Sequence, residues 1–268
     1  MKDALYDEIL TDLKQITSQA GAKILEFYAE DYTDSEKKEF PVTKADLASD
    51  SIISQGLEKY LENGFGILSE ETSADKDYLN HDKVFIVDPI DGTKDFVHKT
   101  GDFSIMIAYV ENGEPVVGVV FKPLGGVLYY AQKNEGAFVE VGGNSEKIEV
   151  SPQEDFTEMR LLVSRYHLRD PEIKLKEELY LADNLAMGSA GLKLCSIAAG
   201  KAHIYVNTSD KTGEWDTAAG SIILQEAGGI ITDLDAKPLD FLKEKPYNTR
   251  GFVASNGTQH EQILNKLK

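Results

Sequence analysis

Four acidic clusters in this sequence contain the residue types that bind divalent cations. They are Asp46, Glu70-Glu71, Asp88 with Asp91, and Asp216. Hard cations such as Mg²⁺ prefer carboxylate oxygens, and water and substrate phosphate complete their coordination. Each cluster alone has an ordinary explanation, because acidic residues are also common at helix starts, in turns and on solvated surfaces. The combination of all four is what predicts a metal site.

The stretch from residue 85 to residue 93 is the centre of this pattern. A run of apolar, mostly β-branched residues ends there in Asp88-Pro89-Ile90-Asp91-Gly92-Thr93. The apolar run predicts a buried strand that carries two carboxylates, three positions apart, to a turn. The Gly-Thr pair can begin a helix, and the unpaired N–H groups of a helix start bind anions. The stretch therefore predicts a cation held beside a phosphate.

Composition limits the function classes. The chain has 268 residues, is 41% hydrophobic and carries a net charge of −18, with a single cysteine, Cys195. The acidic balance argues against a nucleic-acid polymer as partner, because phosphate backbones need a basic surface. A small anionic substrate is still compatible if metal ions supply positive charge locally. One cysteine excludes an internal disulfide. No apolar run is long enough for a secretory or membrane segment, so the sequence predicts a cytoplasmic protein without a membrane span.

Periodicity predicts the elements that position the acidic clusters in the first half of the chain. Apolar residues at spacings of three and four predict helices over 5–28 and 47–61, the second with Thr43 as its cap. A short strand at 66–68 precedes Glu70, and residues 75–83 are expected to form a loop. Glycine-bearing turns predict an antiparallel meander of four strands, at 103–110, 116–121, 127–132 and 136–141.

The second half of the chain predicts alternating strands and helices. The strands are expected at 161–163, 203–206, 230–232 and 252–254, and the helices at 171–181, 189–199, 216–227 and 259–267. A polar stretch at 150–158 predicts a division into residues 1–155 and 156–268. Helices on a largely antiparallel sheet, followed by this alternation, place the chain in the mixed α/β (α+β) class.

Taken together, the clusters resemble the motifs of the lithium-sensitive, Mg²⁺-dependent phosphatase superfamily. It includes inositol monophosphatases, fructose-1,6-bisphosphatases and 3'(2'),5'-bisphosphate nucleotidases. Its Asp-Pro-Ile/Leu-Asp-Gly-Thr motif stands at residues 88–93, Trp-Asp-x-Ala-Ala-Gly at 215–220, the Glu pair at 70–71 and Val-Thr-x-x-Asp at 42–46. The motifs occur in the family's order and cover nearly the whole chain. The resemblance implies a layered αβαβα sandwich with its active site between the two halves.

The resemblance also implies roles for individual residues. Glu70, Asp88, Asp91, Asp216 and the carbonyl of Ile90 would bind two or three Mg²⁺ ions. The backbone amides of Gly92 and Thr93 would hold the phosphate. Thr93 and Asp46 would activate the water that attacks phosphorus in line, and Glu70 is also expected to act in catalysis.

Several motifs favour the bisphosphate nucleotidases of the CysQ group within this superfamily. They are Asp-Gly-Thr-Lys-Asp-Phe at 91–96, Ser-Arg-x-His at 164–167, two small residues followed by any residue and a lysine at 190–193, and Lys-Pro-Leu-Asp at 237–240. This likeness implies a small phosphate ester, 3'-phosphoadenosine 5'-phosphate, as substrate and AMP as product. Its contacts would come from Gly92, Thr93, Ser164, His167, Ser189, Lys193 and Asp216. Gly191 departs from the group, since some nucleotidases have serine there.

Alternatives to this interpretation remain open from sequence. Ser209 stands where inositol monophosphatases carry an acidic residue that contacts sugar hydroxyls. An inositol or fructose phosphate substrate is the nearest rival, and a regulatory protein without turnover is the rival from another class. A lone lysine such as Lys193 usually reaches solvent, and a lone histidine such as His167 is usually structural. A homodimer and inhibition by Li⁺ are expected only because many relatives show them.

Overall fold

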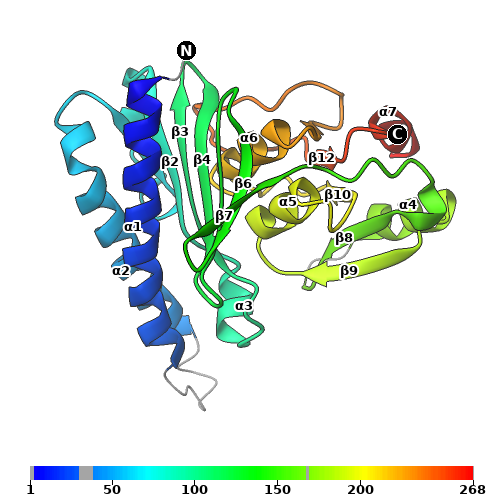
Figure 1. Ribbon diagram of the computed structural model, residues 1–268, viewed down its shortest axis with the longest axis horizontal. Coiled ribbons are helices and arrows are strands. Elements are labelled where there is room, and N and C mark those ends of the chain that lie inside the picture. The colour runs from blue at the N-terminus through cyan, green and yellow to red at the C-terminus, as the bar shows by residue number, and fades with distance from the viewer. Residues whose placement is uncertain (1–2, 30–38, 167–168, 268) are drawn as a thin grey trace.

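The computed structural model describes residues 3–29, 39–166 and 169–267, with residues 39–43 described by backbone alone. Its elements form five layers that alternate helices and sheets (Figure 1). Two helices cover one face of a seven-stranded sheet, two more lie between that sheet and a five-stranded one, and the last two cover the far side. The mixed α/β class and the αβαβα sandwich predicted from sequence are confirmed.

The outer layer on the N-terminal side consists of α1 (Ala4–Ala29) and α2 (Glu39–Leu61). Ile9, Leu13 and Ile16 of α1 are buried, as their spacing predicts. The expectation that Thr43 caps α2 is wrong, because the helix already includes Glu39. Pro41 then lies in its first turn, where proline is tolerated because the first N–H groups of a helix have no intrahelical partner.

The seven-stranded sheet has its strands in sequence order. They are β1 (Gly66–Ser69), β2 (Lys83–Asp91), β3 (Ser104–Glu111), β4 (Glu114–Lys122), β5 (Val127–Gln132), β6 (Gly136–Val141) and β7 (Asn144–Ile148). All neighbouring pairs are antiparallel except β1 with β2. The predicted meander is therefore confirmed. Sequence reasoning missed β7 because four of its five residues are exposed and polar, so it has no apolar alternation.

Short helical turns lie between these strands. Glu70–Thr72 follows β1, Asp77–Asn80 precedes β2, and α3 (Thr93–Val97) follows β2 directly. The prediction of an unbroken loop over 75–83 is thus wrong at Asp77–Asn80, where Tyr78 is buried. The β2 strand runs through Asp91 and thus carries both carboxylates to the turn, as predicted, with a register shift between Asp88 and Asp91.

The second sheet has the order β11-β12-β10-β8-β9. Its strands are β8 (Arg160–Ser164), β9 (Asp183–Met187), β10 (Ile204–Asn207), β11 (Ile230–Thr232) and β12 (Phe252–Ser255). The helices α5 (Ala190–Ala198) and α6 (Ala218–Glu226) lie between the sheets, and α4 (Asp170–Leu179) and α7 (His260–Lys266) lie outside. A short turn, Phe156–Glu158, precedes β8. The missed strand β9 is a largely exposed edge strand, so it lacks the apolar run of its neighbours.

A close approach of α6 to β4 joins the first sheet to the second half of the chain. A Cβ at Gly118 would lie 2.4 Å from Ile222 and 2.7 Å from the carbonyl oxygen of Ala219, so only glycine fits there. The buried side chains of α5 and α6, among them Cys195, pack into one cluster with residues of the first sheet. Trp215, which precedes α6, belongs to the same cluster. A division of the chain at residues 155 and 156 stays a prediction.

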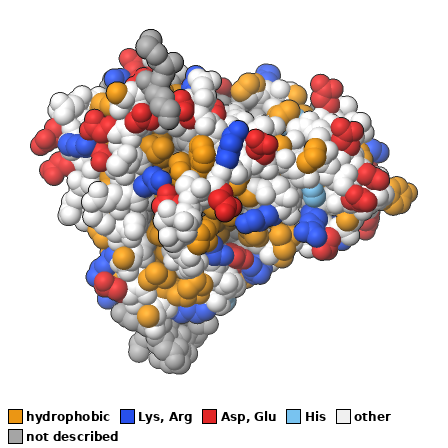
Figure 2. Space-filling view, in the orientation of Figure 1, with side chains coloured by type: hydrophobic (Ala, Val, Ile, Leu, Met, Phe, Trp, Pro, Cys, Tyr) orange, Lys and Arg blue, Asp and Glu red, His pale blue; other side chains and the backbone are white. Residues whose placement is uncertain are grey.

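The surface agrees with the acidic composition. On the face shown in Figure 2, acidic and basic side chains are interspersed among the described residues, without a continuous basic patch. No helix within 3–29, 39–166 or 169–267 is long and apolar enough to cross a membrane.

Candidate active site

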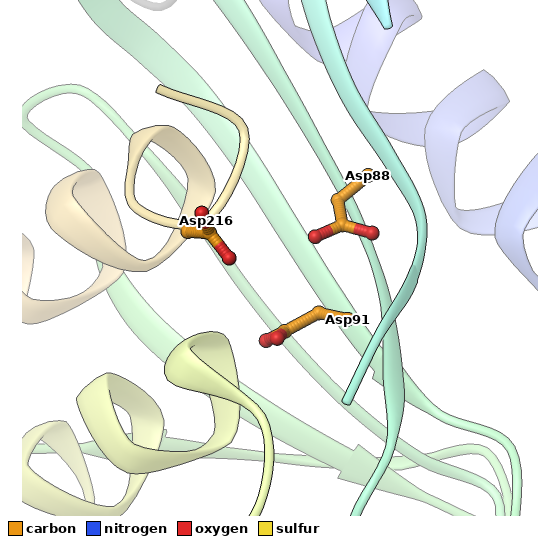
Figure 3. Close-up of side chains that lie close together, drawn as sticks. All are labelled: Asp88, Asp91 and Asp216. Carbon is orange, nitrogen blue, oxygen red and sulfur yellow. The ribbon is translucent and has the colours of Figure 1, made fainter. Parts of the chain in front are cut away.

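Three carboxylates from distant parts of the chain meet between the two sheets. Asp88 and Asp91 lie at the C-terminal end of β2, and Asp216 lies just before α6. One oxygen from each lies within 4.8 Å of the others, and Figure 3 shows the three groups turned toward one another. The irregular register between Asp88 and Asp91 departs from regular strand pairing, and such irregularities re-aim side chains. The sequence motifs at 88–93 and 215–220 are thus brought together.

The cluster is electrostatically costly without a cation. Burial raises the pKa of Asp88 well above its usual range, and repulsion by Glu70 and Asp91 raises it further. Burial likewise raises the pKa of Asp216, with Asp91 and Glu70 adding to the effect. Carboxylates buried together resist ionisation unless positive charge is brought to them. Because the donor set is hard oxygen, the residues present fit a divalent cation such as Mg²⁺ or Ca²⁺.

Glu70 and Asp46 extend the cluster. Glu70 follows β1, and although its side chain is exposed to solvent, desolvation by the surrounding atoms, with repulsion by Asp91 and Glu71, raises its pKa to about 7. Asp46 is buried in α2, and burial together with the charges of Glu71 and Glu70 raises its pKa to about 8. One turn along, the Ser49 hydroxyl donates to the Pro89 carbonyl at 2.9 Å, which ties α2 to the end of β2.

The backbone of β2 is locked around Asp88. The Ile90 N–H donates to Asp88 Oδ1 at 3.1 Å, a short local bond that Asp often forms two residues ahead. This bond fixes one Asp88 oxygen. Ile90 itself is buried, and its peptide lies between the two carboxylate-bearing residues of the strand.

The start of α5 holds Asp91 in place. Asp91 Oδ2 accepts hydrogen bonds from the Ser189 hydroxyl at 2.5 Å and from the Gly191 N–H at 2.9 Å. Ser189 also accepts from the Leu192 N–H and has a φ of 56°, a left-handed conformation that is strained for serine. The Ser189 hydroxyl is therefore engaged with a carboxylate of the cluster, in addition to lining the cavity described below.

Packing explains the glycine at position 191. A Cβ at this position would lie 2.0 Å from the sulfur of Met106, which fills the space below α5. Serine cannot fit beside Met106 without displacement of one of the two. The departure from the nucleotidase pattern at Gly191 is thus accompanied by a large side chain opposite it.

Lys193 is buried, and the alternative that it reaches solvent is wrong. Its Nζ donates to the Ser189 carbonyl at 3.0 Å and lies 4.8 Å from the centre of the Tyr205 ring. Burial lowers the pKa of Lys193, against the attraction of Asp91 and Asp216. Its ammonium group is therefore a positive charge placed beside the carboxylate cluster.

A cavity of about 500 Å³ opens beside these groups. Of the residues predicted to act, its lining contains Asp91, Gly92, Thr93, Ser164, Ser189, Lys193 and Asp216. Asp46, Glu70, Asp88 and Ile90 lie outside that lining, and His167 lies outside the described residues. The lining also contains Lys94 and Tyr166, which lie within the motifs at 91–96 and 164–167 but had no predicted role, and four residues outside every motif: Arg169, Glu172, Tyr205 and Lys211. Sequence contained no signal for them beyond their proximity to the motifs.

Comparison with known proteins identifies the family to which this chain belongs. The sequence profile of the inositol monophosphatase family matches residues 5–268. The chain belongs to the inositol monophosphatase family. It is 36% identical over 233 residues to the 3'(2'),5'-bisphosphate nucleotidase CysQ of Salmonella typhimurium, a match that covers 87% of this chain and 89% of that protein. It is 33% identical to a fructose-1,6-bisphosphatase/inositol-1-monophosphatase of Thermotoga maritima, over 83% of this chain and 80% of that one.

A solved structure agrees with these relatives. The crystal structure of CysQ from Bacteroides thetaiotaomicron superimposes with a TM-score of 0.83 at 30% identity, covering 94% of this chain and 98% of that one. The family resemblance and the likeness to CysQ predicted from the motifs are confirmed.

Arg165 connects the second sheet to the segment after β2, beside the site. Its Nε donates to Asp95 at 3.0 Å, and its second guanidinium nitrogen pairs with Asp102. Asp95 lies in α3, whose first residue is Thr93, and also accepts from Thr100 at 2.5 Å. Arg165 follows β8, so one guanidinium connects the second sheet to the turn after β2.

Replacing Arg165 with alanine is expected to destabilise the protein by about 3 kcal/mol, because it leaves the buried Asp95 carboxylate without its guanidinium partner. Urea unfolding measures this. Lys147→Ala is the control, since Lys147 and its partner Glu149 are both exposed, and exposed pairs contribute about 0–1 kcal/mol. Equal losses of stability in the two variants would contradict the interpretation.

Gly92 occupies a position that only glycine can fill. Its φ is +92°, and a Cβ there would lie 2.7 Å from the Asp102 carbonyl oxygen and 3.2 Å from the Ser189 nitrogen. Both neighbours are backbone atoms, so neither can rotate away. Three segments of the site therefore meet at this glycine.

Gly92→Ala is expected to cost on the order of 2–4 kcal/mol of stability, since it adds a backbone clash to the strain of a positive φ. It should also lower phosphatase activity. Gly64→Ala is the control, because Gly64 has a φ of +84° with nothing within 4 Å of the added Cβ. Thermal unfolding of both variants separates the clash from the strain, and a similar loss in both would show that the close approach is unimportant.

Proposed function

We propose that this protein is a Mg²⁺-dependent phosphatase that removes the 3'-phosphate of 3'-phosphoadenosine 5'-phosphate, producing AMP and phosphate. The observation that supports this most is the cluster of Asp88, Asp91 and Asp216, the first two buried and the third half-buried, beside a cavity that the buried Lys193 also lines. The CysQ relatives, whose names state a 3'(2'),5'-bisphosphate nucleotidase, support the choice of substrate.

The carboxylates of Glu70, Asp88, Asp91 and Asp216, with the Ile90 carbonyl, would hold two or three cations. When bound, Mg²⁺ would supply positive charge to the phosphate and favour ionisation of the attacking water. This charge is needed because a phosphate ester is itself anionic and repels a hydroxide. A chain with a net charge of −18 has to bring that charge in locally.

The chain's own groups would orient the reaction. Gly92 and Thr93 would hold the phosphate by their N–H groups, because Gly92 precedes the first turn of α3. Asp46 and Thr93 would orient the attacking water and take up its proton. Burial and the charges of Glu71 and Glu70 raise the pKa of Asp46 in the metal-free protein, which makes its carboxylate a stronger base toward that proton. Ser189 would act mainly by holding Asp91, with which it shares a hydrogen bond.

The nucleotide would occupy the cavity. Its volume of about 500 Å³ lies within the usual range for small-molecule sites, and Ser164, Ser189 and Lys193 line it. His167 belongs to the same proposal from sequence alone. A location in the cytoplasm and a homodimer stay predictions, and light scattering on the purified protein measures the second.

Phosphate release from three substrates tests the proposal. Adenosine 3',5'-bisphosphate, inositol 1-phosphate and fructose 1,6-bisphosphate are compared at saturating Mg²⁺, with and without millimolar Li⁺. We expect a clear preference for the nucleotide and inhibition by Li⁺. A preference for either sugar phosphate would support the activity named for the Thermotoga maritima relative. Release from none of them would favour a binding protein without turnover.

A further inference from the structure

A second polar group lines the cavity apart from the carboxylate cluster. It consists of Arg169, at the start of α4, with Ser209 and Lys211 from the segment that follows β10. Arg169 donates to the Thr208 carbonyl at 3.4 Å and to the Ser209 hydroxyl at 3.3 Å. The same hydroxyl accepts from the Lys211 N–H at 3.2 Å. The three residues therefore form one connected wall.

The bonds that Arg169 makes there are long. Distances of 3.3 and 3.4 Å exceed the usual 2.7–3.2 Å of such bonds, so they hold the side chain weakly. A guanidinium carries five N–H donors in a planar fork that matches a phosphate. Arg169 can consequently stay bonded to Ser209, or replace these bonds with bonds to an anion at a small cost in free energy.

The basic side chains that line the cavity are unusual for so acidic a protein. Lysine and arginine side chains at four positions, Lys94, Arg169, Lys193 and Lys211, line the cavity although the chain has a net charge of −18. Of the lining carboxylates, Asp91 and Asp216 belong to the metal cluster, and Asp95 pairs with Arg165. Basic side chains gathered in a cleft of an acidic chain indicate an anionic ligand.

Glu172 is the remaining carboxylate of the lining, and it faces Arg169. It is buried, and its Oε2 accepts from the Arg169 backbone N–H at 3.0 Å. That bond fixes the Arg169 backbone at the start of α4. Glu172 offsets part of the positive charge, so the wall suits one phosphate group better than a highly charged polyanion.

We propose that Arg169 and Lys211, joined through Ser209, form a second anion subsite that binds the phosphate group which is not hydrolysed. The inference rests on the proposed function and deepens it: this wall makes the enzyme prefer a substrate with two phosphates over a monophosphate of the same nucleoside. The neutral Ser209 hydroxyl accepts from the Arg169 guanidinium and from the Lys211 backbone N–H. A carboxylate at that position would pair with the guanidinium and neutralise its charge.

Two substrates that differ only in the second phosphate test the proposal. Adenosine 3',5'-bisphosphate and adenosine 3'-monophosphate are hydrolysed by wild type, Arg169→Ala, Arg169→Lys and Ser209→Asp. In Arg169→Ala we expect the KM for the bisphosphate to rise about tenfold or more, as for loss of a charge-assisted pair. The KM for the monophosphate should change much less. Arg169→Lys should recover part of the loss, and Ser209→Asp should resemble Arg169→Ala. Arg250→Ala is the matched control and should leave both values unchanged.

An equal effect of Arg169→Ala on both substrates, or no effect on either, would overturn the subsite while leaving the phosphatase activity intact. Failure of wild type to hydrolyse either nucleotide would instead count against the proposed function. Calorimetric binding of AMP to the metal-free protein then still tests the subsite, because AMP carries only the second phosphate and the carboxylate cluster repels it. We expect Arg169→Ala to bind AMP about tenfold more weakly than wild type. Equal binding by the two proteins would overturn the inference.

Discussion

Asp91→Asn is expected to lower phosphate release by roughly 10³-fold or more, since it removes a charged group from the centre of the charge-stabilising machinery. The protein should still fold. Asparagine has nearly the same shape, and its carbonyl oxygen can accept the bonds that Gly191 and Ser189 donate. The substitution also removes one of several carboxylates that repel each other, so the metal-free variant should be at least as stable as wild type.

Steady-state kinetics at several Mg²⁺ concentrations and thermal unfolding without metal measure the two parts of this prediction. Asp235→Asn is the matched control, because Asp235 is an exposed aspartate that pairs with Arg250. Activity of Asp91→Asn close to that of wild type at any Mg²⁺ concentration would remove Asp91 from the proposed site. A metal-free variant much less stable than wild type would show that Asp91 serves the fold through α5.

Removal of divalent metal is expected to abolish activity and to make stability depend on pH. In the metal-free protein the pKa of Asp46 is about 8 and that of Glu70 about 7, both above the values of the unfolded chain. The folded state therefore binds more protons than the unfolded state from about pH 4, near the ordinary pKa of both carboxyls, up to about pH 8. By linkage, the stability of the metal-free protein should fall as the pH rises through this range and level off above it.

Differential scanning fluorimetry across this pH range, with and without Mg²⁺, checks the sign. With Mg²⁺ the midpoint of unfolding should rise and lose most of its pH dependence, because the cation replaces the protons. Asp46→Asn should flatten the metal-free curve, since of the two carboxyls it removes the one whose pKa is raised further. A metal-free protein that gains stability as the pH rises would disprove the assignment of these carboxylates to one repulsive cluster.

Much of the fold could be predicted locally. The helix α1 and the strands β5, β6 and β11 follow from apolar spacing and glycine turns, because periodicity reports directly which side of an element is buried. The elements that were missed, β7 and β9, are largely exposed and have no such contrast. Thr43 was misassigned as a cap because helix starts have weak local signals when proline lies in the first turn.

The acidic motifs were also visible in the sequence, because metal chemistry restricts the residue types that can serve it. The stretch at 88–93 already contained two carboxylates and the glycine that the turn requires. Its likeness to a known family was sufficient to place Asp216 beside it, across more than a hundred residues. Local chemistry thus identified the candidate metal ligands.

Long-range packing was needed for the rest of the site. Segments that are distant in the chain are joined by the bond from Ser189 to Asp91 and by the bridge from Arg165 to Asp95. The burial of Lys193 likewise depends on how distant segments pack around it. The wall of Arg169 and Lys211 exists because α4 and the segment after β10 meet at one cavity. Such contacts depend on how layers pack, and no local spacing reports which side chains face each other across them. The residue types and their spacing were therefore sufficient to predict the metal-dependent chemistry. The shape and charge of the cavity could be determined only from the folded chain.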